Sequence, residues 1–380
     1  MAVTKKTFWA EVHLARLQNN LKKAISLLQP GTRLLGVVKA NAYGHGIEEA
    51  GKALLLAGAY GLAVGTVDEG MLLREAGVKA PVLLLGYLVP GEEEYVINYR
   101  LTPMIANMSM ARQLARLTRL KGRRLPFQVR LDTSEGNVGL LPEQAPDFIK
   151  KVLQMKELLL EGIFTHLYSS YGNQQEMLSL QLKRFQKALN DITSAGIAVP
   201  MVHAASSPAL LYYPETHFNA VRPGTVLYGL PSLEGQDMNG FLPVMELKSR
   251  VVDVKALPPG NFQGYGYSIK KEKPVRVATI SAGYAHGYLL FNLKNGEVLI
   301  RGKRAPIYAP PQMEYFMADV TSIPEVVPGD EVVLLGCQGK EEILASEIAH
   351  KSGISIIHCE SICLLNPSVP RVYFPKKNEQ

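Results

Sequence analysis

A lysine near the N-terminus is the residue of this sequence best suited to covalent chemistry. Residues 34–38 form an apolar run that predicts a buried strand, and residues 40–46 contain two glycines and predict a turn. Lys39 therefore lies at the mouth of a strand. An amine shielded from water there has its charged form disfavoured, so its pKa falls and it becomes a usable nucleophile or base. A solvated lysine capping the strand is the structural alternative.

The elements that would position Lys39 alternate between apolar runs and helical patterns. Eight runs predict strands, most of them followed by an amphipathic helix: residues 34–38, 61–64, 82–85, 102–105, 127–131, 162–166, 201–203 and 220–222. One helix begins at Thr66, which forms a capping box with Glu69, and ends at Gly77. Eight strand–helix units predict an α/β domain with a closed (β/α)₈ TIM barrel, which we place at residues 1–242.

Several polar residues fall where barrel enzymes carry their chemistry, at the C-terminal ends of the strands. Lys39, His166 and Arg222 with Gly224 lie at the ends of the first, sixth and eighth strands, and Ser207 follows the seventh. Phosphate commonly binds beside strands 7 and 8, which makes Ser207 and Gly224 candidates for a phosphate site. Taken singly, His166 would be a hydrogen-bonded core histidine and Arg222 an ion-pair residue.

The pattern changes after the barrel to β-type runs separated by tight turns. These runs are residues 247–254, 275–280, 298–300 and 332–335, with one helix near residues 343–350. We therefore expect a mostly β domain over residues 243–380.

Composition excludes several classes of protein. No apolar run approaches the ~20 residues that span a bilayer, and the N-terminus lacks the apolar segment of a secretion signal. Three cysteines are too few for a disulfide framework and no pair predicts a metal site, so we expect a cytoplasmic protein without metal. The net charge of +7 is modest, and the densest basic stretch reads as a solvated helix face (Arg112, Arg116, Arg119, Arg123 and Arg124). We expect neither a nucleic-acid nor a membrane partner.

A series of motifs, colinear across both predicted domains, resembles the alanine racemase family. The string VVKANAYGHG at residues 37–46 is similar to the motif whose lysine binds pyridoxal 5′-phosphate (PLP) as a Schiff base. The others are WAE at 9–11, TH at 165–166, VRPG at 221–224, LYG at 227–229, YG at 265–266, GYA at 283–285, RGKRAP at 301–306 and VPRVY at 369–373. The resemblance implies a PLP-dependent amino-acid racemase that interconverts L- and D-alanine or a related amino acid, with a different, larger amino acid as the alternative substrate.

The resemblance also implies roles for particular residues. Lys39 and Tyr265 would be the two catalytic acid–base groups on opposite faces of the substrate, with Tyr265 supplied by the partner subunit of a homodimer with shared active sites. Arg222 would hydrogen-bond the pyridine nitrogen of PLP, and His166 would lie against its ring. The remaining cofactor-binding residues, which would hold the phosphate, would be Tyr43, Ser207 and Gly224.

The sequence departs from the family on the substrate side. Residues 130–139 read RLDTSEGNVG where the family has K-x-D-T-G-M-x-R-x-G. Arg130 therefore replaces a lysine that many members carbamylate, and Asn137 replaces the arginine that this carbamate orients. We expect Arg130 to assume part of that arginine's role, with Glu135 or Asp132 as competing ion-pair partners.

Further substitutions surround the same expected pocket. Met313 is a third candidate for substrate binding, but its motif reads Gln312-Met313-Glu314 in place of [CS]-M-D. His286 replaces the aspartate of GYADG, and Cys359 stands where the family has a tyrosine. These changes predict a pocket less tailored to alanine.

Two other functions compete with racemisation. A PLP decarboxylase on the same barrel would place an acidic residue at the pyridine nitrogen, and Arg222 argues against it. A PLP-binding homologue with little or no racemase activity is the other alternative, although single-barrel PLP carriers lack the second domain that this sequence predicts.

Overall fold

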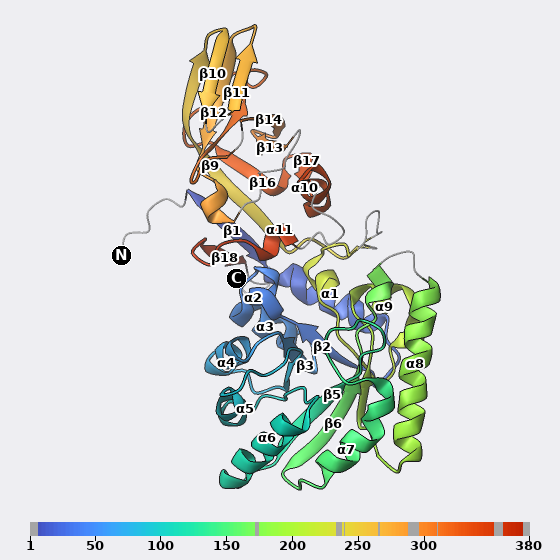
Figure 1. Cartoon of the computed structure of the whole chain (residues 1–380). Coiled ribbons are helices and arrows are strands. Elements are labelled where there is room, and N and C mark those ends of the chain that lie inside the picture. Colours follow the sequence, from blue (N-terminus) through green and yellow to red (C-terminus); the bar gives the residue numbers. More distant parts are fainter. Residues whose placement is uncertain are drawn as a thin grey trace. The chain divides into compact units, whose positions relative to one another are not determined.

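The structure is a computed structural model that describes residues 7–171, 175–232, 238, 240–264, 267–287, 296–309, 311–352 and 360–374. The chain forms two compact units (Figure 1). The barrel unit comprises Leu17–Ala42 and Gly46–Leu227. The β unit contains the described residues up to Arg16, the short segment Tyr43–His45, and the described residues from Tyr228 onward.

The barrel unit is built on a curled sheet of parallel strands in the order β4-β3-β2-β8-β7-β6-β5. These strands are β2 (Arg33–Val37), β3 (Gly61–Val64), β4 (Val82–Leu84), β5 (Leu125–Arg130), β6 (Leu158–Phe164), β7 (Met201–His203) and β8 (Ala220–Val221). Residues 102–105 join the two edge strands, because Leu84 N–H donates to Thr102 O at 2.9 Å and Ile105 N–H donates to Gln128 O at 2.9 Å. The predicted eight-fold barrel is therefore confirmed, with an irregular fourth strand.

Helices line the outside of these strands (Figure 1). They are α3 (Ile47–Leu56), α4 (Val67–Glu75), α5 (Glu93–Asn98), α6 (Met108–Leu120), α7 (Ala145–Leu153), α8 (Gln175–Ser194) and α9 (Ser207–Tyr212), with α1 (Leu14–Ser26) and the short α2 (Lys39–Tyr43) before them. Single 3₁₀ turns cover Pro142–Gln144, Tyr168–Tyr171, Pro214–Thr216, Thr225–Tyr228 and Tyr284–His286. On α6 the predicted solvated face is confirmed, because Arg112, Arg116 and Arg119 are exposed. Within the described part of the chain, no helix is both long enough and apolar enough to cross a bilayer.

The start of α4 follows the sequence prediction only in part. Thr66 Oγ1 accepts the N–H of Glu69 at 3.3 Å, as a helix cap should, and Gly77 takes a left-handed φ of 89° after the helix ends. The expected return bond of a capping box, from Thr66 N–H to the Glu69 carboxylate, is replaced. That carboxylate instead accepts N–H groups from Gly65 at 2.8 Å and Asn41 at 3.2 Å.

The β unit contains one large sheet with the strand order β17-β16-β13-β14-β15-β12-β9-β1-β18. Its strands are β1 (Phe8–His13), β9 (Met245–Leu257), β12 (Val275–Ile280), β13 (Glu297–Ile300), β14 (Lys303–Ala309), β15 (Phe316–Asp319), β16 (Glu331–Gln338), β17 (Glu341–Ile343) and β18 (Arg371–Phe374). A further pairing of β16 with β9 closes six of these strands into a small barrel. The predicted β-type runs are therefore confirmed as β9, β12, β13 and β16.

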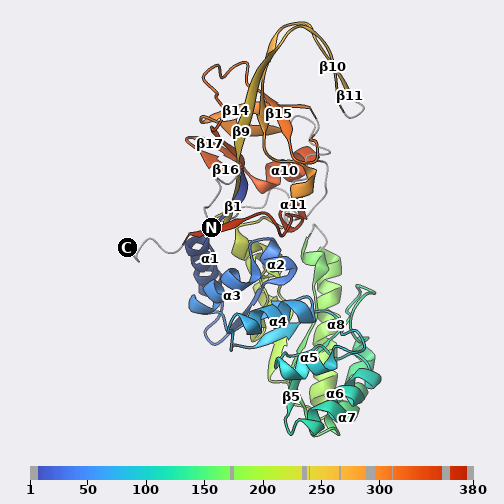
Figure 2. The same ribbon diagram turned by 90° about the vertical axis from the view of Figure 1, so that its left-hand side faces the viewer.

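The first strand of the chain belongs to this β unit. β1 pairs with β9 in antiparallel fashion, with Ala10 opposite Leu247, and in parallel with β18. A boundary at residue 242 therefore separates the two sequence patterns, but the N-terminal strand β1 packs with the β unit that follows that boundary. The hairpin of β10 (Gly260–Gly264) and β11 (Tyr267–Lys271) lies beyond the curved end of β9, as Figure 2 shows.

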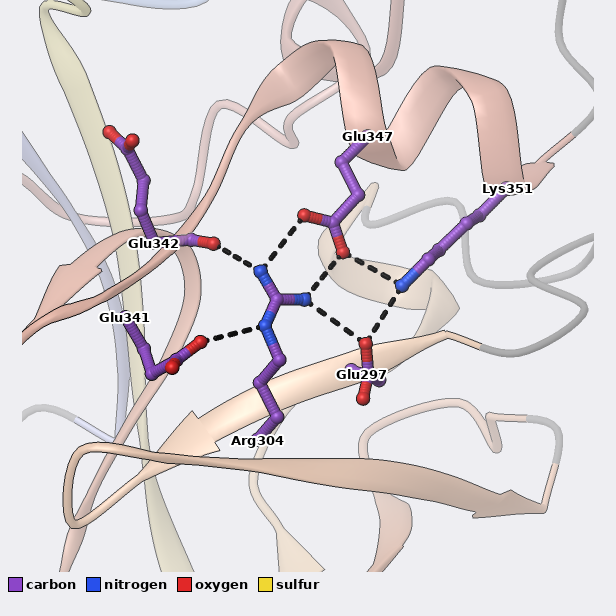
Figure 3. A network of polar contacts seen from close by, with 6 residues as sticks. All are labelled: Glu297, Arg304, Glu341, Glu342, Glu347 and Lys351. Atoms are coloured by element: carbon purple, nitrogen blue, oxygen red, sulfur yellow. Dashed lines mark hydrogen bonds and ion pairs between the residues drawn. The ribbon is translucent and has the colours of Figure 1, made fainter.

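An ion-pair network connects α10 (Ala345–Ser352), the helix predicted for the second domain, to strands of the β unit (Figure 3). The Arg304 guanidinium contacts Glu347 at 2.8 Å, Glu297 at 3.0 Å and Glu341 at 2.9 Å. Lys351 reaches the same Glu297 at 2.9 Å and Glu347 at 2.7 Å. The short α11 (Glu360–Cys363) follows later in the chain.

Candidate active site

The backbone that follows Lys39 is left-handed. Ala40 (φ 53°, ψ 51°), Asn41 (φ 54°, ψ 46°) and Ala42 (φ 54°, ψ 52°) adopt this conformation in succession, and Tyr43 continues it with φ 51°. For an L-residue other than glycine it costs about 1–2 kcal/mol per residue. The predicted turn after the strand is thus confirmed, but its first four residues are left-handed without being glycine, and Gly44 (φ 81°) follows them.

Lys39 itself is exposed. The expectation that its amine is shielded from water is therefore wrong for this structure, because the residue stands past the end of β2 and the turn leads the chain away from it. Ala42 N–H donates to Val38 O at 2.8 Å, which anchors the turn to the buried end of the strand.

Ser207 and Gly224 lie together at the ends of the seventh and eighth barrel strands, as the sequence predicts. Ser207 Oγ accepts the N–H of Gly224 at 2.9 Å and that of Val226 at 3.3 Å, and Ser207 is buried. With two acceptor positions filled, its hydroxyl proton remains available to an external acceptor.

Ser206, which the sequence analysis missed, adds a second hydroxyl beside Ser207. It precedes α9 in an extended conformation, and its Oγ is buried without a hydrogen-bond partner among the described residues. A buried orphan hydroxyl carries a free-energy penalty unless a ligand or water satisfies it. Ser206 and Ser207 therefore suit an anionic ligand with several acceptor oxygens, such as a phosphate group.

Arg222 is buried inside the barrel, where its guanidinium has several acceptors, among them Ala204 O at 3.5 Å. Its Nη1 donates to His203 Nδ1 at 2.5 Å, and its Nη2 donates to Thr165 O at 2.7 Å. Burial, and then the Arg222 charge, lower the pKa of His203 well below its usual value, so this histidine is neutral. Its Nδ1 therefore accepts from Arg222, and its Nε2–H donates to Gln128 Oε1 at 2.7 Å.

His203 is a second residue that the sequence analysis missed as functional. The available signal was a histidine at the end of the seventh apolar run, on the strand beside the one that leads to Arg222. Because its far nitrogen is bound to Gln128, the imidazole ring cannot rotate freely and fixes the guanidinium of Arg222.

His166, at the end of the sixth barrel strand, lies within the electrostatic influence of three cationic residues. Desolvation first, and then the charges of Arg222, Arg130 and Lys39, lower its pKa to about 3. The imidazole is therefore neutral at physiological pH, and three cations act on it at this end of the barrel. Such surroundings favour a ligand that carries several negative charges.

Arg130, the last residue of β5, is buried and ion-paired with Glu135, one of the two competing partners that we expected. Its Nε has no hydrogen-bond partner within the described part of the chain. The other competitor, Asp132, is occupied by the backbone: it accepts N–H groups from Ser134 at 3.0 Å, Glu135 at 2.7 Å and Asn137 at 3.1 Å. Asn137 is exposed, and its backbone belongs to this turn.

Tyr43 and Met313, two further predicted site residues, belong to the β unit and are described within it. Tyr43 is buried and its ring packs on Tyr228, with 4.9 Å between ring centres. Met313 is exposed, and its carbonyl accepts the N–H of Ala285 at 3.0 Å. Tyr265 and Cys359 lie outside the described residues.

Comparison with known proteins agrees with this geometry. Residues 12–232 match the alanine racemase N-terminal domain, and residues 244–373 match the alanine racemase C-terminal domain. The chain is 39% identical to the alanine racemase of Carboxydothermus hydrogenoformans, over 96% of this chain and 99% of that protein. It is 36% identical to the alanine racemase of Halothermothrix orenii, over 98% of this chain and 97% of that protein.

Solved structures show the same similarity in three dimensions. The alanine racemase of Bacillus anthracis with bound L-Ala-P superposes with a TM-score of 0.88 at 31% identity, covering 98% of this chain and 96% of that chain. The alanine racemase of Clostridium difficile 630 gives a TM-score of 0.90 at 29% identity, covering 97% and 96%. A TIM-like barrel with buried arginines and a pair of serine hydroxyls suited to phosphate at one end, together with a mostly β second domain, is the architecture of a PLP-dependent racemase. The chain belongs to the alanine racemase family.

Proposed function

We propose that this protein interconverts L- and D-alanine at the open end of its barrel, with PLP held on Lys39. The observations that support this most directly are the adjoining hydroxyls of Ser206 and Ser207 and the buried guanidinium of Arg222, all at the ends of the seventh and eighth barrel strands. When bound, PLP supplies an electron sink that makes the α-hydrogen of the amino acid acidic enough to remove. The amino acids of the chain supply binding, orientation and proton transfer.

Arg222 and the two serines would orient the cofactor. A guanidinium keeps its proton at any working pH, so Arg222 can only donate to the pyridine nitrogen, and His203 and Thr165 fix its direction. A donor that never releases its proton leaves that nitrogen unprotonated, which limits side reactions. Ser206 Oγ and Ser207 O–H, with Tyr43 as a further hydroxyl, would bind the phosphate, and Gly224 N–H fixes Ser207.

Lys39 and Tyr265 would move the proton. We propose that the Lys39 amine serves one face of the reacting α-carbon and the Tyr265 hydroxyl the other, with Tyr265 supplied by the partner subunit of a homodimer. One group removes the proton and the opposite group returns one, so that either enantiomer yields the other. Replacement of Tyr265 by phenylalanine should lower kcat by about 10²–10⁴-fold while PLP stays bound.

A less selective racemase is a second candidate, and the Arg130–Glu135 ion pair favours it. Arg130 replaces an anionic carbamate with a cation, and Asn137 removes a cation from the segment, so the charges around the amino-acid carboxylate differ from those of the family. We propose that Arg130, Asn137 and Met313 form the substrate side of the pocket. An amino acid larger than alanine could then be accepted.

One experiment tests both candidates. The PLP-loaded protein is incubated in D₂O with a panel of L-amino acids, and deuterium at the α-carbon and the D-enantiomer are measured together. We expect exchange and racemisation of alanine, with Lys39→Ala as the inactive control. If no amino acid exchanges its α-hydrogen, both candidates are wrong.

A further inference from the structure

One carboxylate joins the turn behind Lys39 to the loop after the neighbouring strand. Glu69 Oε1 accepts the N–H of Asn41 at 3.2 Å, and Glu69 Oε2 accepts the N–H of Gly65 at 2.8 Å. Asn41 is the second residue of the left-handed segment, and Gly65 directly follows β3, which pairs with β2. The two oxygens of Glu69 therefore hold together the backbones that leave two adjacent strands.

The left-handed segment needs such external bonds. Three of its non-glycine residues, Ala40, Asn41 and Ala42, have φ values of 53–54°, which L-residues other than glycine avoid. Asn41 is held by further bonds: its carbonyl accepts the N–H of Gly46 at 2.9 Å, and its Oδ1 accepts that of Ile47 at 2.9 Å. Its own N–H is the group that Glu69 accepts.

Lys39 lies close to this clamp. A Cβ atom placed on Gly65 would be 3.4 Å from Glu69 Oε2 and 3.6 Å from the Cβ of Lys39. The lysine stem, the glycine and the carboxylate thus pack side by side. A shift of the clamped backbone would change the direction in which the Lys39 side chain leaves the barrel.

We propose that Glu69 is a positioning residue, which holds the left-handed turn and so aims the amine of Lys39. The inference rests on the proposed role of Lys39 as the amine that binds PLP. A carboxylate suits the task because it offers an acceptor to each of two N–H groups and has no donor to oppose them. Glu69 lies in the first turn of α4, where the carboxylate of a capping-box glutamate would usually accept the N–H of Thr66. Its carboxylate instead accepts the N–H groups of Asn41 and Gly65, which indicates a different function.

Replacement of Glu69 by glutamine tests the proposal, since the amide keeps one acceptor and turns a donor toward the second N–H. We expect at least a tenfold loss of PLP affinity, measured by absorbance titration of the apoprotein, and an altered visible circular dichroism of the bound cofactor. The matched control is Glu93→Gln, because Glu93 also accepts a loop N–H, that of Gly91 at 2.8 Å, at the start of the next helix. It should leave both readouts unchanged.

A glycine at a left-handed position of the turn tests whether Glu69 acts by holding that turn or by stabilising the protein in general. Ala40 is exposed, so Ala40→Gly opens no cavity, and glycine adopts φ 53° without strain. In the Glu69→Gln background it should restore most of the lost PLP affinity. If Glu69→Gln resembles the wild type, or if Ala40→Gly restores nothing, the proposal is overturned.

A second variant covers the case in which Glu69→Gln does not fold. Ala40→Val keeps Glu69 but puts a β-branched residue at a left-handed position, which disfavours the turn. It should reproduce the loss of PLP affinity, and wild-type affinity in this variant would also overturn the proposal. Failure of the proposed function would look different, because the wild-type protein would then carry no PLP that borohydride can fix to Lys39.

Discussion

Arg130 is the residue whose role bears most on substrate choice. Arg130 is the last residue of β5, is almost fully buried, and forms an ion pair with Glu135. Its Nε has no hydrogen-bond partner among the described residues. A buried donor of this kind can serve an incoming carboxylate or a cofactor oxygen. The ion pair with Glu135 competes with that use, so the two roles need to be separated by experiment.

Arg130→Ala should raise the KM for alanine or lower kcat, giving about a ten- to hundred-fold loss of kcat/KM, because a hydrogen bond to a charged group contributes about 1.5–3 kcal/mol. Glu135→Gln removes the competing anion and should leave kcat/KM equal to the wild type or higher. Steady-state racemisation rates of the two variants measure this. Unaltered KM and turnover in Arg130→Ala would mean that Arg130 only forms a structural ion pair with Glu135.

The position of a site residue was predictable from the sequence where a local motif defines it. A hydrogen bond between residues distant in the chain was not. Lys39, Ser207, Arg222 and Gly224 fall at strand ends that apolar runs reveal. The bond between His203 and Arg222 depends on the order of strands in the sheet, and local patterns do not encode it.

At the scale of elements, the ion-pair network around α10 gives the β unit a pH-dependent contact. Burial raises the pKa of Glu347, but hydrogen bonds from Arg304 and Lys351 outweigh this effect, so the pKa is lowered from its usual 4.5. The pKa of Glu297 is lowered for the same reasons. A carboxyl with a depressed pKa stabilises the folded state above its unfolded pKa, and this contribution is lost as the pH falls through the folded value. The pKa of Lys351 is raised, so its contribution persists below 10.5 and is lost only in more alkaline solution.

Glu347→Gln should therefore speed the hydrogen exchange of α10 amides at pH 7 by about fivefold, which corresponds to a loss of about 1 kcal/mol from partly exposed ion pairs. As the pH falls from 4.5 through the depressed pKa of Glu347, the ratio of variant to wild type should approach one, because the wild-type carboxyl then loses its charge as the glutamine has already done. Glu325→Gln is the control, since the pair of Glu325 with Lys303 is more exposed and does not involve α10. A ratio that stays constant over this pH range would contradict the assignment.

The strands were largely predictable as elements because their apolar runs are unbroken and turn residues bound them. The left-handed conformation of residues 40–43 was not predictable, because none of these residues is a glycine, the residue type that usually indicates a positive φ. The placement of β1 was also missed, because a strand pattern does not reveal that its partners, β9 and β18, lie more than two hundred residues away.

At the scale of the whole molecule, we propose a homodimer in which each active site combines Lys39 of one subunit with Tyr265 of the other. Mixing Lys39→Ala subunits with Tyr265→Ala subunits tests this without a structure of the dimer. A mixed dimer would hold one site with both changes and one with neither, so random mixing should restore about one quarter of wild-type activity. If each subunit instead carries a complete site, the mixture should remain as inactive as its components.

The attachment of PLP to Lys39 tests the central claim most directly. The PLP-loaded protein is reduced with borohydride, digested, and the peptide that carries the cofactor is identified by mass spectrometry. Lys52→Ala serves as a control because Lys52 lies on the next helix, α3, in an ion pair with Glu49. The account predicts cofactor on the peptide containing Lys39 in the wild type and in Lys52→Ala, and none at that site in Lys39→Ala. Reduced cofactor on a different lysine of the wild type, or no fixed cofactor at all, would contradict it.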